Sequence, residues 1–324
     1  MQKIEAPIEI HAYTGYGNKN SIYCYGRILK KTKLYNNNSN NKLLQLINTI
    51  KRLRSGELPH FNFTFDINGF TKKHKTNTEG FYLIHEKINN EKKSNLEEIT
   101  IKVLQEDVSK KFKKSISIEV TSEIIFPKEN ATLGFISDLD DTIIKTDVLS
   151  KYRWKMFYNS FLLNVTSRKA IHGTSAWYNK MHKNLHPFFY VSNSPWNFYD
   201  YITQFLHLNE YPKGPLLLRD YGRKATDALQ DYEQHKKHEI EKIIEMYPQL
   251  QFVLIGDGGE RDADIYLEMY QKYPGKIKAI FIRRLGDIFH QSRLEKLAEG
   301  HEDYFFLFKK AEEAEVIATR LGLV

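Results

Sequence analysis

Three aspartates follow one apolar segment closely enough to act on the same group. The stretch GFISDLDDTIIKTD, residues 134–147, contains Asp138, Asp140 and Asp141. Carboxylates packed this closely repel one another, and a divalent cation that prefers oxygen ligands, such as Mg²⁺, would relieve the repulsion. An acidic helix N-cap would explain one of the aspartates but not the whole group. The stretch therefore predicts a cation site just after the apolar segment.

A second acidic motif follows another apolar segment. The stretch IGDGGERD, residues 255–262, carries Asp257 and Asp262. If both apolar segments are strands of one parallel sheet, their carboxyl ends meet at one edge. The two groups of carboxylates would then share a site.

The stretch YVSNSPWNFYD, residues 190–200, predicts an anion site. Ser194 is suited to cap a helix that has Pro195 in its first position. The free N–H groups at such a helix start accept an anion, and the Ser192 hydroxyl could donate to it as well. Phosphate is the anion that this arrangement favours.

A lysine on a predicted helix could supply the balancing positive charge. In EQHKKHEIEKIIEMYP, residues 233–248, apolar side chains form one buried stripe, and Pro248 ends the helix. At 100° per residue, Lys236 lies roughly 30° from the centre of that stripe and Lys237 roughly 70° away. Lys236 should therefore point inward, where an ammonium group needs an anionic partner.

The elements that must position these residues indicate an α/β domain over residues 131–324. Near-continuous apolar segments alternate with helical ones, which is typical of parallel strands buried on both faces. Three of the segments end in Asp138, Ser192 and Asp257, so one shared site at the carboxyl edge of a Rossmann-like sheet is expected. The five segments are LGFISD, HPFFYVSN, PLLLRD, FVLIGD and KIKAIFIRR.

The preceding residues, 1–130, predict a separate β-rich domain. Period-two alternation in FNFTFDI, ITIKV and ISIEV, with turn signals between them, favours a small β-sandwich. A helical segment near residues 42–54 is expected as an insertion, and FPKEN, residues 126–130, as a linker.

Composition limits the classes of partner and location. The excess positive charge lies in residues 1–132, with 22 Lys+Arg against 14 Asp+Glu, and could meet an anionic membrane surface or nucleic acid, or only solvate the surface. A recognisable nucleic-acid-binding motif is lacking, so nucleic acid is not expected. The absence of a long apolar run and of a signal peptide, together with a single cysteine, Cys24, predicts a cytoplasmic protein without a transmembrane helix.

The order DLDDT, Ser192, Lys236 and GDGGERD resembles the four motifs of the haloacid dehalogenase superfamily of phosphotransferases. More closely, GFISDLDDTIIKTDV, FYVSNSPWNFYD, GPLLLRDYG and the segment through GDGGERDADIY resemble the catalytic domain of the actin-patch type of phosphatidate phosphatases. The N-terminal YTGYGNKNSIYCYGRIL and TNTEGFY resemble the β module of bacterial members. The resemblance implies a Rossmann-like sheet of the haloacid dehalogenase type with a minimal cap.

The resemblance also implies a Mg²⁺-dependent phosphatase. Asp138 would be the nucleophile that becomes an aspartyl phosphate, and Asp140 the general acid and then the general base. Mg²⁺ would be held by the Asp138 carboxylate, the Asp140 main-chain carbonyl and Asp257. A carboxylate attacks an anionic phosphate only when nearby positive charge cancels the repulsion, which agrees with these roles.

The remaining motif residues would bind the phosphoryl group. Ser192, Asn193 and Lys236 are implied as its ligands, with Asp262 orienting Lys236 or a water molecule near the metal. Thr142 is expected to bond to the main chain nearby. Members of the family usually have GDSG where this chain has GDGG, so Gly258 removes one hydroxyl near the metal.

The spacing between motifs bears on the substrate. There are 51 residues between Asp140 and Ser192 and 43 between Ser192 and Lys236, too few for a folded lid beyond the elements of the sheet. An open site suits a bulky substrate, such as phosphatidate or a related lipid phosphate, with peripheral contact to a membrane. Aromatic residues within 154–162 could touch acyl chains or form core. Soluble or protein-borne phosphomonoesters, and a module that only recognises phosphate, are the alternatives.

Overall fold

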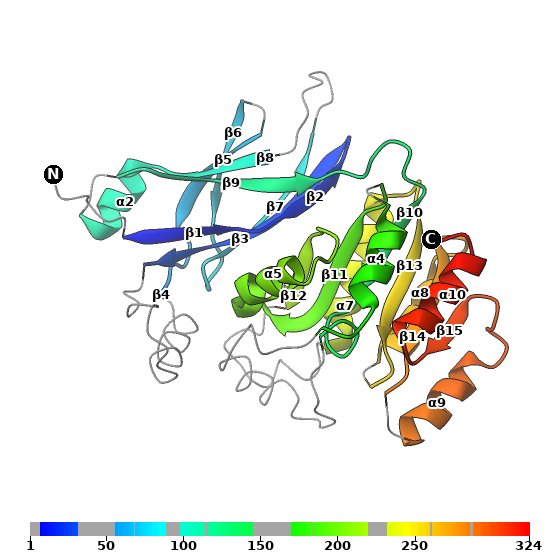
Figure 1. The fold of residues 1–324 in the computed structure, drawn as a ribbon. Helices are drawn as coiled ribbons and strands as arrows, with labels where there is room; N and C mark the ends of the chain where they lie inside the picture. Colours follow the sequence, from blue (N-terminus) through cyan, green and yellow to red (C-terminus); the bar gives the residue numbers. More distant parts are fainter. Residues whose placement is uncertain are drawn as a thin grey trace. The chain divides into compact units, whose positions relative to one another are not determined.

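The chain forms two compact units, Met1–Phe126 and Pro127–Val324, in a computed structural model (Figure 1). The division after Phe126 falls within the stretch that the sequence predicts as a linker. The predicted helical segment near 42–54 and the aromatic residues of 154–162 lie outside the described part of the chain. The structure describes residues 7–31, 56–67, 69–88, 98–113, 116–144, 170–183, 185–219, 232–259, 261–285 and 288–324.

The described part of the first unit is a nine-stranded mixed sheet with one short helix, α2 (Gln105–Phe112). The strands pair in the order β1-β3-β2-β9-β8-β5-β6, with β4 and β7 also paired to β3. Only the β2–β9 pair is parallel among these described strands. Their bounds are β1 (Ile8–Ala12), β2 (Gly15–Asn18), β3 (Ser21–Lys30), β4 (Gly56–Glu57), β5 (Asn62–Ile67), β6 (Phe70–Lys75), β7 (Phe81–Lys87), β8 (Glu98–Val103) and β9 (Ile118–Ile125).

The two halves of this sheet share one hydrophobic core. Ile22 and Cys24 of β3 belong to the same buried cluster as Phe63 and Phe65 of β5 and Ile101 of β8. The sequence predicts a small sandwich. In the structure, the described strands form one continuous hydrogen-bonded sheet, and its two halves pack on a common core. Burial raises the pKa of the Cys24 thiol to about 12, so this cysteine stays protonated.

The second unit is an α/β domain with a six-stranded, wholly parallel sheet. Its strands are β10 (Leu133–Ser137), β11 (Phe188–Pro195), β12 (Leu216–Arg219), β13 (Gln251–Asp257), β14 (Ile277–Arg283) and β15 (Phe305–Phe308). The first five are the apolar segments that the sequence predicts as strands, and β15 is an addition. The helical elements are α4 (Thr174–His182), η2 (Trp196–Phe198), α5 (Tyr199–Leu208), α7 (Tyr232–Met246), α8 (Asp262–Lys272), α9 (Ile288–Ala298) and α10 (Ala311–Arg320).

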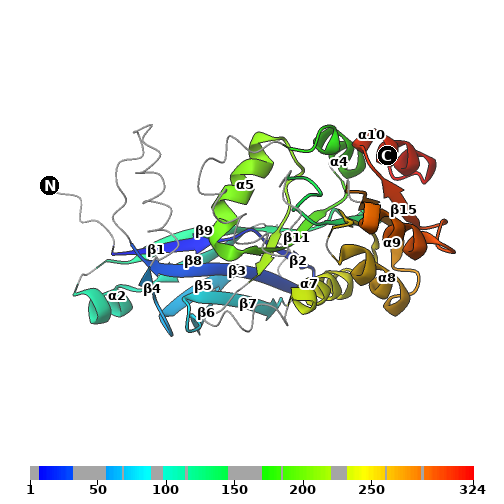
Figure 2. The same ribbon diagram turned by 90° about the horizontal axis from the view of Figure 1, so that it is seen from below.

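The strand order places the ends of β10 and β13 side by side. The order is β12-β11-β10-β13-β14-β15. Strands β11 and β12 are thus added on one side of β10, and β13, β14 and β15 on its other side. Helices α4, α5 and α10 cover one face of the sheet, and α7 and α8 cover the other (Figure 2). Ligands bind in such sheets where the order reverses, beyond the carboxyl ends of the strands. That point lies between Asp138 and Asp257.

Within the part of the chain that the structure describes, no helix is both long and apolar enough to span a bilayer. Helix α7 buries its apolar stripe, Ile240, Ile243 and Ile244, in the core of the unit. It contacts β11 and α8. The helix is therefore positioned to bring a side chain from its inner side to the carboxyl edge.

Candidate active site

Asp138 follows β10 directly, and its carboxylate is buried with only 1 % exposure. Its main-chain N–H donates to the Ile255 carbonyl of β13 at 2.8 Å, which fixes its position at the strand end. Oδ1 accepts a hydrogen bond from Lys236 Nζ at 2.9 Å, and Oδ2 accepts one from the Thr142 hydroxyl at 3.1 Å. The Thr142 side chain thus bonds to the Asp138 carboxylate, whereas the sequence predicts a bond to the main chain.

Lys236 lies on the buried side of α7, as its position in the helical pattern predicts, and is 0 % exposed. Its Nζ donates to Asp138 Oδ1 at 2.9 Å and to Asp262 Oδ1 at 2.5 Å. Burying an ammonium group without partners would cost several kcal/mol. Two buried carboxylates supply the opposite charge, so the lysine is held at one place with its charge directed at the strand ends.

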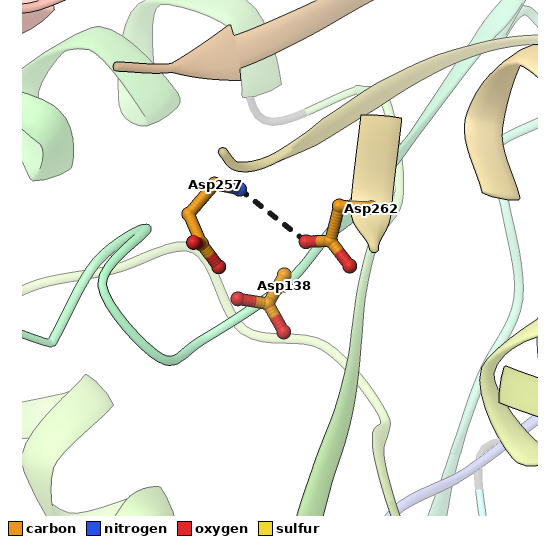
Figure 3. A group of neighbouring side chains, drawn as sticks. All are labelled: Asp138, Asp257 and Asp262. Atoms are coloured by element: carbon orange, nitrogen blue, oxygen red, sulfur yellow. Dashed lines mark hydrogen bonds between the residues drawn. The ribbon is translucent and has the colours of Figure 1, made fainter. Parts of the chain in front are cut away.

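Asp262, the first residue of α8, joins the two acidic motifs. Its Oδ2 accepts a hydrogen bond from the Asp257 main-chain N–H at 3.3 Å, drawn in Figure 3. All three side chains, Asp138, Asp257 and Asp262, are buried, and each offers a carboxylate oxygen within 4.8 Å of those of the others. The structure therefore gathers acidic groups from two strand ends and one helix start.

These carboxylates fit a hard divalent cation. Asp138, Asp257 and Asp262 place three acidic side chains in a buried space, and a buried lysine, Lys236, is bonded to two of them. All donors are carboxylate oxygens, the ligands that Mg²⁺ prefers. The sequence-based ligand set of Asp138, Asp257 and the Asp140 main-chain carbonyl stays a prediction, and Asp262 is the further acid that lies beside it.

The Asp140 side chain is turned toward β11. Its Oδ2 accepts hydrogen bonds from the Ser192 hydroxyl at 3.2 Å and the Ser194 hydroxyl at 3.1 Å. Ser192 Oγ in turn accepts from the Ser194 main-chain N–H at 2.9 Å. Asn193 is buried between the two serines. The Asp140 carboxylate is thus held by two hydroxyl donors at the same edge as Asp138.

The prediction that Ser194 caps a helix beginning with Pro195 is wrong. Strand β11 continues to Pro195, the 3-10 turn η2 follows, and α5 begins only at Tyr199. The Ser194 hydroxyl bonds to Asp140 and makes no helix cap. A long-range partner therefore takes the side chain that local sequence rules assign to a cap.

A buried tyrosine, Tyr178, forms a hydrogen bond with the last residue of β10, Ser137. The Ser137 hydroxyl donates to the Asp138 carbonyl at 2.7 Å, and the Tyr178 hydroxyl lies 2.8 Å from Ser137 Oγ. Burial raises the pKa of Tyr178 well above its ordinary value, with the Ser137 hydrogen bond opposing this, so Tyr178 stays protonated and can donate. Sequence analysis missed this pair, because nothing in the α4 sequence links Tyr178 to β10.

Arg283 is a second residue that sequence analysis missed. It ends β14 as the register partner of Asp257 on β13, and its Nη1 donates to the Asp141 carbonyl at 2.7 Å. Asp141 has a left-handed backbone, with φ of 54°. Arg283 therefore ties the turn after Asp140 to the end of the neighbouring strands. The segment AIFIRRL signals a strand but not this contact.

Gly258 leaves room that another side chain fills. A Cβ atom built on Gly258 would overlap Leu294 Cδ1 of α9. The chain thus has a leucine methyl group where a serine at this position would place its side chain. A serine at 258 would require Leu294 to move, which the end of a leucine side chain can do at modest cost.

His235, the residue before Lys236 on α7, makes the stability of the unit depend on pH. Burial lowers the pKa of His235 to about 3, Arg219, Lys242 and Lys236 add to the shift, and a hydrogen bond with the Leu217 main chain opposes it. Because the unfolded chain takes up a proton near pH 6.5 and the folded chain does not, the free energy of unfolding must fall as pH drops below that value. We expect a loss of about 2 kcal/mol between pH 6.5 and pH 5.

Urea unfolding at several pH values measures this dependence. His235→Gln should be less dependent on pH over the same interval than the wild type. Equal dependence in the two proteins would mean that His235 is protonated in the folded state as easily as in the unfolded one.

Fold and site together define an α/β domain whose carboxyl edge carries a buried carboxylate–lysine centre. Residues 133–284, which include all of these groups, match the family model "Phosphatidate phosphatase APP1, catalytic domain". Over 153 residues the chain is 36 % identical to "Phosphatidate phosphatase APP1" of Saccharomyces cerevisiae, covering 47 % of this chain and 26 % of that protein.

A second curated relative extends the similarity. The "Uncharacterized protein C29B5.04c" of Schizosaccharomyces pombe is 28 % identical over 213 residues, which are 64 % of this chain and 34 % of that protein. The chain thus aligns with only about a quarter to a third of the length of these relatives. The similarity is to one segment within longer proteins.

Proposed function

We propose that the second unit, Pro127–Val324, is a phosphatase that hydrolyses a phosphomonoester, with a sheet and chemistry of the haloacid dehalogenase type. The observation that carries this proposal is the buried Lys236 ammonium between Asp138 and Asp262, beside Asp257, in a segment that matches a catalytic domain. A carboxylate beside a fixed cation is what attack on an anionic phosphoryl group requires.

In the first half of the reaction, a carboxylate oxygen of Asp138 attacks phosphorus. The bond from phosphorus to the leaving oxygen breaks, and Asp140 in its protonated form gives that oxygen a proton. The Ser192 and Ser194 hydroxyls hold the Asp140 side chain in place. Lys236 offsets the negative charge of the phosphoryl group and of Asp138.

In the second half, water attacks the aspartyl phosphate. Asp140, now a carboxylate, takes a proton from the water, the bond between phosphorus and the Asp138 oxygen breaks, and phosphate leaves. Ser192 can turn its hydroxyl from Asp140 to a phosphoryl oxygen, because Ser194 still donates to Asp140. Asn193, buried on the same strand, is proposed as a further phosphate ligand.

A divalent cation, most simply Mg²⁺, fits the oxygen donors of this edge. Asp138, Asp257 and the Asp140 main-chain carbonyl would hold it. When bound, it would neutralise charge on the phosphoryl oxygens. Asp262 would orient Lys236, to which it is bonded at 2.5 Å.

The proposed substrate is phosphatidate or a related lipid phosphate, met by a cytoplasmic protein at a membrane surface. The support is the family model of residues 133–284 and the short spacing between the motifs, from which the sequence predicts no folded lid. A phosphatase of soluble or protein-borne phosphomonoesters is the alternative. A module that only recognises phosphate is less well supported, because recognition does not require Asp140 beside Asp138.

Phosphate release in the presence of Mg²⁺ tests the proposal. Wild type and Asp138→Asn would be compared on phosphatidate vesicles, on vesicles of other phospholipids and on a soluble aryl phosphate. We expect the wild type to release phosphate from phosphatidate and from the aryl phosphate, and Asp138→Asn to release it from neither. If the wild type releases phosphate from no substrate, the enzyme proposal is wrong, and release from the aryl phosphate alone would exclude the lipid substrate.

Gly256 is predicted to tolerate no side chain. A Cβ atom at this position would lie 2.8 Å from Asp262 Cβ and closer still to Oδ2. Gly256→Ala must therefore displace Asp262 from Lys236 and from the Asp257 N–H. We expect phosphate release to fall on the order of a hundredfold, as for a catalytic group misplaced by about 1 Å.

The matched control for this variant is Gly275→Ala. Gly275 has open space around its Cβ position and lies in the turn before β14, although its positive φ of 75° will cost some stability. Its activity should stay near that of the wild type. Wild-type activity in Gly256→Ala would show that the contact between β13 and Asp262 does not position the site.

A further inference from the structure

The β5–β6 hairpin of the first unit presents an unusual edge. Strand β6 ends the path of paired strands and bonds to β5 alone among the described strands (Figure 1). Five of its six residues are exposed and the sixth is half-buried. Its sequence, FTKKHK, has an aromatic residue at the turn and three lysines, with no acidic residue.

The aromatic residue is held out at the tip of the hairpin. Phe70 is 61 % exposed and faces Ile67 at the end of the ladder. The Asp66 carboxylate accepts hydrogen bonds from the Gly69 N–H and from the Thr71 hydroxyl, each at 2.9 Å. These bonds connect β5 to the start of β6 next to Phe70, whose large apolar ring remains exposed.

The lysines next to this ring differ in their partners. Lys72 forms an ion pair with Glu86 of β7, and its Nζ lies 5.5 Å from the centroid of the Phe70 ring. Lys73 and Lys75 are exposed and form no ion pair with any residue that the structure describes. Within the part of the chain that the structure describes, Lys73 and Lys75 thus carry positive charge without an ion-pair partner, on the same strand as the exposed aromatic ring.

Lysines on an edge strand also discourage pairing with strands of other molecules. That role accounts for Lys73 and Lys75 but gives no reason to expose Phe70, which would favour aggregation. An aromatic ring with cations behind it instead matches a bilayer surface, where rings enter the interface and cations meet lipid phosphates.

We propose that the β5–β6 hairpin docks the protein on an anionic lipid surface, with Phe70 entering the interface and Lys73 and Lys75 facing the phosphates. This docking rests on the proposed function, because it brings the protein to a surface that holds an anionic lipid phosphate. Along β6, Lys73 lies about 10 Å and Lys75 about 17 Å from Phe70. Since charges are screened over about 8 Å at physiological salt, Lys73 contributes more than Lys75.

Vesicle co-sedimentation of the full chain tests the docking. The vesicles are phosphatidylcholine with or without phosphatidylglycerol, which supplies negative charge without being a phosphomonoester. We expect binding only to the anionic vesicles. Phe70→Ser should weaken it about tenfold, and Lys73→Ala about fivefold, with a smaller loss for Lys75→Ala. The matched controls are Leu208→Ser and Lys278→Ala, exposed residues of the second unit, and both should bind like the wild type.

Each outcome decides between explanations. If the wild type does not bind anionic vesicles, or if Phe70→Ser binds as well as the wild type, the docking proposal is wrong, and the hairpin would then suit a protein partner. Equal losses for Lys73→Ala and Lys75→Ala with no effect of Phe70→Ser would show only diffuse charge attraction.

Activity on a soluble aryl phosphate separates this proposal from the proposed function. The hairpin variants should hydrolyse the aryl phosphate like the wild type while losing activity on vesicles. Vesicle binding by a wild type that releases no phosphate would leave the docking intact and remove the phosphatase.

Discussion

Asp138→Asn is expected to lower phosphate release by at least about a thousandfold, because the amide cannot form the aspartyl phosphate. The substituted amide would keep the size of the side chain and could still accept from Lys236 Nζ, which lies 2.9 Å from Asp138 Oδ1. The loss should therefore appear in kcat and not in folding. Phosphate release under single-turnover conditions, with circular dichroism as a check on folding, measures it.

Asp141→Asn is the matched control for this prediction. Asp141 is buried in the same stretch with a left-handed backbone that asparagine also accepts, and its main-chain carbonyl makes the bond to Arg283. Its activity should stay within a few-fold of the wild type. Equal losses in the two variants would mean that the crowded acidic stretch as a whole, rather than the Asp138 carboxylate, supports the reaction.

Lys236→Met is expected to lower both activity and stability. The variant removes the ammonium that faces the phosphoryl group, and it leaves the buried carboxylates of Asp138 and Asp262 without that counter-charge. Breaking a buried ion pair from one side typically costs 3–5 kcal/mol, so we expect a destabilisation of about 3 kcal/mol. Phosphate release should fall by about a hundredfold or more.

Lys237→Met is the matched control. It shows whether activity and stability depend on the buried position of Lys236 or on any positive charge in this part of α7. Lys237 is the next residue on α7, and it pairs with Glu268 near the surface at 2.5 Å. Surface pairs contribute about 0–1 kcal/mol, so this variant should be nearly as stable and as active as the wild type. Urea unfolding and phosphate release of both variants make the comparison. An active, stable Lys236→Met would contradict the role proposed for the buried lysine.

Much of the fold could be predicted because its signals are local. The strands β10–β14 are continuous apolar segments, and burial on both faces requires that composition. Strand β15, Phe305–Phe308, is not predicted, because a short apolar segment does not by itself distinguish a strand from part of a buried helix. In the first unit, alternation of apolar and polar residues predicts strands such as β5. It does not predict that the two halves of the unit form one continuous sheet.

The site residues likewise fall into those that local sequence patterns predict and those that they do not. Asp138 and Asp257 could be placed from the sequence because each follows an apolar strand, and Lys236 because helical periodicity assigns its inward direction. Ser194 was assigned wrongly, since capping rules consider only the neighbouring residues. Its actual partner, Asp140, is 54 positions away along the chain.

The sequence by itself thus determined which residues stand at the carboxyl edge of a parallel sheet and which helix side faces it, because strand and helix periods depend on a few neighbouring residues. Only the tertiary structure decided which of them touch. Lys236 lies between Asp138 and Asp262, and Arg283 reaches the Asp141 carbonyl. Such contacts depend on how segments that are far apart in the sequence pack together. The order of the strands and the positions of the helices set that packing, and local sequence patterns contain no information about it.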